Sequence, residues 1–93
     1  MFDTLFHIIE DRKKENPPGS YTCHLFNEGQ ETILKKINEE CFEVVFASTS
    51  QGDQRLIEET ADLIYHLFVL LSYKNLTLEM VQEELSLRHI QKS

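Results

Sequence analysis

Apolar side chains recur along the chain at intervals of three and four residues, the spacing that places them on one face of an α-helix. Phe2, Leu5, Phe6 and Ile9 begin this pattern. The helix that they predict ends before Asn16, because a residue that precedes a proline disfavours the helical conformation. No segment alternates apolar and polar residues for long enough to predict a strand, so the expected fold class is all-α.

Clusters of proline and glycine divide the remaining chain into further helices. A short second helix is expected before Gly29, with Ser20 or Thr22 as its N-cap. Two longer helices follow, and a last one completes a bundle of about five. Their expected positions are 31–48 and 54–73, with Asp53 capping the fourth helix, Asn75 in a left-handed conformation after it, and Thr77 capping the last.

The predicted fourth helix carries more apolar surface than a small chain can cover. Between residues 63 and 71 it is apolar nearly all round, and such a helix is buried on several sides. A chain of 93 residues has little material for this, so we expect a homodimer. The residues predicted to face inward elsewhere are Ile33, Leu34, Ile37, Cys41, Val44 and Val45 in the third helix and Leu78, Val81 and Leu85 in the last.

Length and charge narrow the classes of function. The 93 residues are enough for one domain, expected to span 1–93. The formal net charge of −7 argues against binding to nucleic acid or to an anionic lipid surface, because both need a basic face. A ligand that bears phosphate stays compatible with this charge if a metal ion supplies positive charge. The longest apolar run is the segment 63–71, too short to span a membrane.

The two cysteines, Cys23 and Cys41, are too few for a disulfide scaffold, and we expect both thiols to be buried or half-buried. The first residues of the chain carry Asp3 and His7 inside their apolar stretch, which does not match a signal peptide. Both observations predict a cytoplasmic location.

Two pairs of acids carry the main chemical signal. Glu40 and Glu43 in the third helix are three residues apart and share one face. Glu59 and Asp62 have the same spacing in the fourth helix. An antiparallel hairpin that turns at Gln51 brings both pairs to matching levels. The levels are Glu43 with Glu59, Glu40 with Asp62, and Lys36 with His66.

Four carboxylates so close raise one another's pKa, so they either share protons or bind a metal ion. The alternative is that each pair lies on an ordinary solvated helix face. All four offer hard oxygen ligands, which suit Mg²⁺ or Mn²⁺, and neither helix has the Glu-x-x-His motif of di-iron bundles. Bound Mg²⁺ usually contacts substrate phosphates and activates water. The pattern therefore indicates metal-assisted hydrolysis of a phosphoanhydride, with Lys36 in reach of a phosphate.

Further motifs accompany the acids in a fixed order: Arg12, the Ser-Tyr-Thr segment 20–22, and the run 62–71 that begins Asp-Leu-x-Tyr-His. From about Leu5 to Arg88 the chain resembles the phosphoribosyl-ATP pyrophosphohydrolase family, a member of the MazG-like all-α nucleotide pyrophosphohydrolases. The acid pairs are shared by that whole superfamily. The Ser-Tyr-Thr segment and the run 62–71 are specific to the family.

The resemblance implies hydrolysis of phosphoribosyl-ATP to phosphoribosyl-AMP and pyrophosphate with Mg²⁺, the second step of histidine biosynthesis. It also implies a homodimer with sites between helices, in a form without the cyclohydrolase domain of many relatives. The metal ligands that it implies are Glu40, Glu43, Glu59 and Asp62. The substrate contacts that it implies are Arg12, Ser20, Tyr21, Thr22, Lys36 and His66. Glu40 is the residue expected to orient the attacking water, with Glu39 as the alternative.

Two other functions stay open from the sequence. A general pyrophosphatase of nucleoside triphosphates would share the acid pairs, and the Ser-Tyr-Thr segment together with Arg12 distinguishes the two enzymes. A non-enzymatic helical dimerisation module would bind no Mg²⁺.

Overall fold

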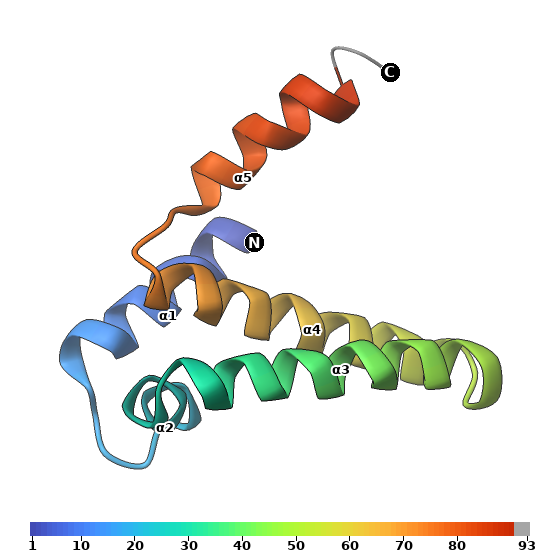
Figure 1. The fold of residues 1–93 in the computed structure, drawn as a ribbon, viewed down its shortest axis with the longest axis horizontal. Coiled ribbons are helices and arrows are strands. Elements are labelled where there is room, and N and C mark those ends of the chain that lie inside the picture. Colours follow the sequence, from blue (N-terminus) through green and yellow to red (C-terminus); the bar gives the residue numbers. More distant parts are fainter. Residues whose placement is uncertain (91–93) are drawn as a thin grey trace.

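A computed structural model describes residues 1–90, and every secondary-structure element within that range is helical. The expected all-α class is therefore confirmed, and so are the five α-helices (Figure 1). The last α-helix continues into a short π-helical turn, η1. The helices are α1 (Phe2–Glu15), α2 (Tyr21–Glu28), α3 (Gln30–Ser50), α4 (Asp53–Tyr73) and α5 (Leu78–Leu85), followed by η1 (Ser86–Ile90).

Most of the predicted caps are confirmed. The Ser20 hydroxyl accepts a hydrogen bond from the Cys23 amide at 3.3 Å, and Thr77 accepts one from Met80 at the same distance. Asn75 has the expected left-handed conformation, with φ 60°. The predicted capping role of Asp53 is wrong: Gly52 precedes the helix with φ 89°, so α4 begins at Asp53 itself.

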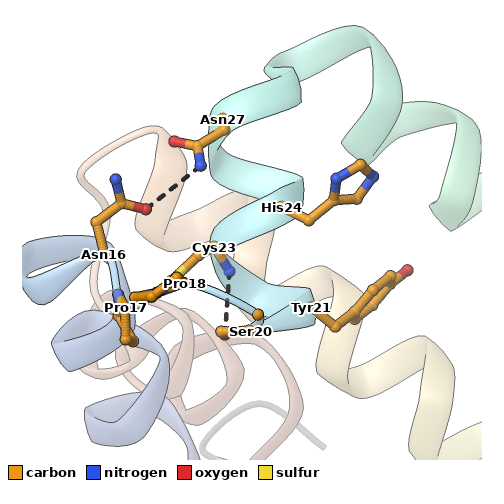
Figure 2. Close-up of a pocket in the computed structure, with 9 residues that line it drawn as sticks. Asn16, Pro17, Pro18, Ser20, Tyr21, Cys23, His24 and Asn27 are labelled. Carbon is orange, nitrogen blue, oxygen red and sulfur yellow. Dashed lines mark hydrogen bonds between the residues drawn. The ribbon is translucent and has the colours of Figure 1, made fainter.

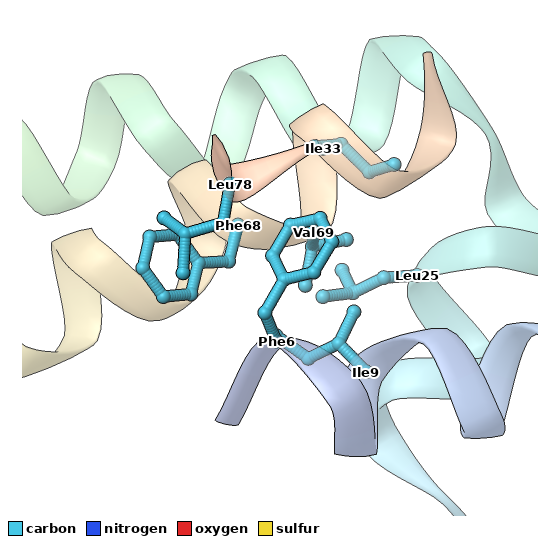
Figure 3. Packing of buried hydrophobic residues seen from close by; sticks show 7 residues of the cluster. All are labelled: Phe6, Ile9, Leu25, Ile33, Phe68, Val69 and Leu78. Atoms are coloured by element: carbon cyan, nitrogen blue, oxygen red, sulfur yellow. The ribbon is translucent and has the colours of Figure 1, made fainter. Parts of the chain in front are cut away.

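The core lies where α1 and α2 cover one end of the antiparallel pair α3 and α4 (Figure 3). Ile9, Leu25, Ile33 and Val69 are completely buried there, one from each of these four helices. Phe68 packs edge-to-face on Phe6, with ring centroids 5.6 Å apart. The chain thus supplies its own cover for much of the apolar segment 63–71.

The predicted inward face of α3 is only partly correct. Ile33 is buried, and Ile37 and Val44 are half-buried, but Leu34, Cys41 and Val45 are exposed. The reason is that α3 carries apolar residues on two faces, of which α4 covers one. The expectation of a covered thiol is therefore confirmed for Cys23 and wrong for Cys41.

The last helix also differs from the prediction. Leu78 is buried, whereas Val81 and Leu85 are exposed. Figure 1 shows why: α5 extends away from α1–α4, so most of its apolar face meets no other part of residues 1–90. Within residues 1–90, no helix combines the length and apolarity needed to cross a membrane.

Candidate active site

Three of the four predicted acids come together between α3 and α4. Glu40, Glu59 and Asp62 each place a carboxylate oxygen within 4.8 Å of the others, and we call these three residues the acid cluster. Glu40 and Asp62 are the pair that the antiparallel register brings to one level. Glu43 lies one turn further along α3 and is not part of the cluster.

The electrostatics of the acid cluster are those of crowded carboxylates. Burial, a hydrogen bond with Glu59, and the negative charges of Asp62 and Glu59 raise the pKa of Glu40 from 4.5 to about 6. The positive charge of Lys36 opposes this rise. The cluster can therefore relieve its repulsion by retaining a proton or by binding a cation.

Arg55 supplies one positive charge to the cluster that the sequence-based site did not include. Its guanidinium forms an ion pair with the buried carboxylate of Glu59 and a second one with the exposed Glu58. Arg55 precedes Glu59 by four residues in the same helix, a spacing that favours such pairs and was visible in the sequence.

The predicted substrate segment 20–22 lies beside the acid cluster. The Tyr21 hydroxyl is 3.0 Å from Nε2 of His66. Burial raises the pKa of Tyr21, and the negative charges of Glu40, Glu39 and Asp62 add to the rise, while Lys36 opposes it. These charges act on Tyr21 because its hydroxyl lies near them, so the tyrosine is a neutral phenol at the edge of the cluster.

Thr22 and Arg12 lie around a second tyrosine, Tyr65. The Thr22 hydroxyl is hydrogen-bonded to the Tyr65 hydroxyl, and the ring of Tyr65 stacks on that of Tyr21 at 6.2 Å between centroids. Burial raises the pKa of Tyr65, whereas the Thr22 hydrogen bond and the charge of Arg12 lower it. Ser20 has a different task, because its side chain caps α2.

Glu39 and Glu40, the two residues considered for orienting water, differ in their position relative to the acid cluster. Lys36 is half-buried and donates to Glu39 at 3.4 Å. Glu39 is exposed and lies outside the acid cluster, whereas Glu40 lies within it. Of the two residues considered for orienting water, only Glu40 thus lies among the clustered acids.

A pocket of about 610 Å³ borders this region at the start of α2 (Figure 2). The loop 16–20 forms one side of it, and Tyr21, His24 and Asn27 form another. Asn27 donates to the side chain of Asn16 at 3.3 Å across the pocket. The sequence offered no signal for His24 and Asn27, because their place depends on how α2 lies against the loop.

The acid cluster fits a hard divalent cation by its donor set, which consists of carboxylate oxygens alone. The fold and the cluster together define an all-α protein with an acidic, oxygen-only site between two antiparallel helices. A family model described as "Phosphoribosyl-ATP pyrophosphohydrolase" matches residues 2–89, nearly the whole chain. The chain belongs to this family.

Curated relatives agree with the family match. A protein named phosphoribosyl-ATP pyrophosphatase from Bacillus cereus (strain AH820) is 48% identical over 88 residues, covering 95% of this chain and 82% of that protein. A protein of the same name from Bacillus anthracis (strain A0248) has the same identity and coverage. One from Bacillus thuringiensis (strain Al Hakam) is 46% identical over the same share of both chains.

Proposed function

We propose that this protein hydrolyses phosphoribosyl-ATP to phosphoribosyl-AMP and pyrophosphate, the second step of histidine biosynthesis. The observation that carries the proposal is the acid cluster of Glu40, Glu59 and Asp62 in a chain that belongs to this family. The relatives that match over 95% of the chain carry the name of the same activity. In the reaction a water oxygen bonds to phosphorus, the phosphoanhydride bond breaks, and phosphoribosyl-AMP and pyrophosphate are the two products.

The proposed cofactor is Mg²⁺, with Mn²⁺ as a chemical substitute. The proposed ligands are the acid cluster together with Glu43, which lies on the same helix one turn beyond Glu40. A bound Mg²⁺ would neutralise these acids, polarise phosphate oxygens and lower the pKa of a water molecule. The donor set supports this assignment, because carboxylate oxygens suit these two ions.

The proposed roles of the protein's own groups follow from their positions. Glu40 accepts a proton from the attacking water, a role that suits a carboxyl whose pKa is raised to about 6. Lys36 and Arg12 contribute positive charge towards the anionic substrate. Tyr21 and Thr22 line the approach to the cluster, and Ser20 holds the start of α2 in place.

The direct test is pyrophosphate release from phosphoribosyl-ATP in the presence of Mg²⁺. We expect turnover of this substrate, with ATP and deoxynucleoside triphosphates hydrolysed at least about 100-fold less efficiently in kcat/KM. The selectivity is expected because Tyr21 lies near the acids and Arg12 lies near Tyr65, on which Tyr21 stacks, so these groups can contact the rest of a large substrate. Comparable kcat/KM values for all triphosphates would instead identify a general nucleotide pyrophosphatase, and no hydrolysis of any would identify a non-enzymatic module.

A second test concerns the metal and its dependence on pH. Without metal, the raised pKa of Glu40 means that its contribution to stability is present below about pH 4.5 and is lost as the pH rises through about 6. Bound Mg²⁺ requires the ionised carboxylates, so the increase in Tm on adding Mg²⁺ should be several degrees at about pH 7.5 and much smaller at about pH 5. Sodium chloride at equal ionic strength is the control for screening. An equal effect of Mg²⁺ and sodium chloride at both pH values would contradict the metal assignment.

The proposed assembly is a homodimer. Its support is the apolar surface that stays exposed on two parts of the single chain. These exposed side chains are Leu34, Phe42, Val45 and Phe46 on α3, and Met80, Val81, Leu85 and Leu87 on α5 and η1. A monomeric soluble protein rarely exposes so many large apolar side chains together. Light scattering is expected to give twice the chain mass of 10.9 kDa, and a single-chain mass at micromolar concentration would contradict the dimer.

The proposed location is the cytoplasm, where exposed thiols such as that of Cys41 stay reduced.

A further inference from the structure

The buried histidine of α4 has both of its ring nitrogens engaged within the chain. His66 is only 5% exposed. Its Nδ1 lies 2.7 Å from the main-chain oxygen of Asp62, one turn earlier in the same helix. A carbonyl oxygen can only accept a hydrogen bond, so the proton of the imidazole resides on Nδ1.

The proton on Nδ1 decides the direction of the second contact. In a neutral imidazole the other nitrogen, Nε2, carries a lone pair and accepts. The Tyr21 hydroxyl lies 3.0 Å from Nε2 and therefore donates its proton to His66. The neutral ring satisfies both contacts, which suits a side chain with almost no access to water.

This arrangement leaves the Tyr21 oxygen with free lone pairs and no free proton. Tyr21 is 46% exposed, and its ring rests against α4, where it stacks on Tyr65 and meets His66 in a T-shaped contact at 5.9 Å between centroids. The phenolic oxygen lies near Lys36 and the acid cluster, where a substrate would lie. Phosphate oxygens ionised at neutral pH have no proton to donate, so they are not the matching group.

We propose that His66 is a positioning residue which fixes Tyr21 as a hydrogen-bond acceptor for a donor group of the substrate, such as a ribose hydroxyl. The inference rests on the proposed function for the identity of the substrate. It replaces the expectation that His66 itself contacts substrate, because neither ring nitrogen is left for a ligand. Recognition of a donor at Tyr21 favours a substrate with a free sugar hydroxyl over a bare polyphosphate.

The test compares variants that keep or remove one hydrogen bond. The amide of His66→Asn reaches only as far as the position of Nδ1, so it keeps the contact with Asp62 and loses that with Tyr21. The longer His66→Gln reaches the position of Nε2 and can still accept from Tyr21. Tyr21→Phe removes the hydroxyl itself. Tyr73→Phe is the matched control, since Tyr73 packs against the core away from the acid cluster.

We expect His66→Asn and Tyr21→Phe each to raise KM for phosphoribosyl-ATP about 5- to 10-fold, with kcat changed less. A contact remote from the reacting phosphorus contributes binding that is uniform between ground and transition states, so its loss appears in KM. His66→Gln should stay within about threefold of the wild type. The double variant with both Tyr21→Phe and His66→Asn should have a KM no higher than that of the more impaired single variant, because both changes remove the same contact.

Three kinetic results would overturn the inference: an unchanged KM in His66→Asn, equal increases in KM in His66→Asn and His66→Gln, or increases that multiply in the double variant.

A measurement without substrate tests the same contact. Nitrogen-15 NMR of the wild type should show the proton of His66 on Nδ1, and the Nε2 resonance should move in Tyr21→Phe but not in Tyr73→Phe. A proton on Nε2, or an unmoved resonance, refutes the arrangement even where His66→Asn does not fold. A wild type that releases no pyrophosphate refutes the proposed function instead, and the NMR result then still decides the His66–Tyr21 geometry.

Discussion

Replacing any acid of the proposed metal site by its amide should lower kcat/KM by roughly 100-fold or more, about 3 kcal/mol of transition-state stabilisation. The variants are Glu40→Gln, Glu43→Gln, Glu59→Gln and Asp62→Asn. Each keeps the side-chain volume and removes one negative charge. The large effect is expected because an oxygen-only site binds its cation through these charges. Pyrophosphate release from phosphoribosyl-ATP is the measurement.

Melting curves of the same variants without metal separate a catalytic role from a structural one. Glu40→Gln should melt no lower than the wild type, because it removes a charge that its neighbours repel. Glu59→Gln loses its ion pair with Arg55, so a small decrease is expected there. The exposed Glu31→Gln is the control and should change neither property. Variants that melt several degrees lower but keep their activity per folded molecule would show that the acids are structural.

An acid on the exposed apolar face of α3 should separate the proposed dimer. Val45 is 64% exposed in the single chain and does not belong to its buried core, so we expect Val45→Asp to leave the fold of the chain intact. In a symmetric dimer the change occurs twice, and each copy loses an apolar contact and buries a charge. We expect dimer affinity to fall by about 1000-fold or more, which sedimentation or light scattering over a range of concentrations measures.

The matched control for this experiment is Gln51→Asp, which adds the same charge at an exposed position in the turn between α3 and α4. It should leave the dimer unchanged. An intact dimer in Val45→Asp would move the interface to another surface. An acid at Val69, in contrast, cannot test assembly, because Val69 is fully buried in the core of the single chain.

The hairpin and all three members of the acid cluster could be predicted from sequence because both depend on local rules. Helical periodicity fixes which face each acid shares, and a short turn at Gly52 fixes the level at which α3 meets α4. Glu40 and Asp62 therefore meet where the register puts them. Glu43 shows the limit of this reasoning: it was predicted to join the other acids, but it lies outside the acid cluster.

Apolar periodicity alone could not predict which part of the protein covers each apolar helix face. Val45 and Val81 lie on apolar stripes as regular as that of Ile33, yet the single chain leaves both exposed. A stripe indicates that a face is to be buried, and it does not say whether the same chain or a second copy buries it. The ion pair of Arg55 with Glu59 and the contact of His66 with Tyr21 were not predicted for a related reason, since such partners depend on the final positions of side chains.

The joint between α2 and α3 consists of one residue, Gly29, with φ 98° and ψ −173°. This backbone conformation is available almost only to glycine, whereas an added Cβ would meet nothing closer than the Tyr73 hydroxyl at 3.7 Å. The eight residues of α2 form a rigid arm about 12 Å long, with Tyr21 at its far end. A swing of about 20° at the joint would carry Tyr21 about 4 Å, more than the length of its bond to His66. The position of Tyr21 beside His66 therefore depends on a backbone conformation at Gly29 that few other residues adopt.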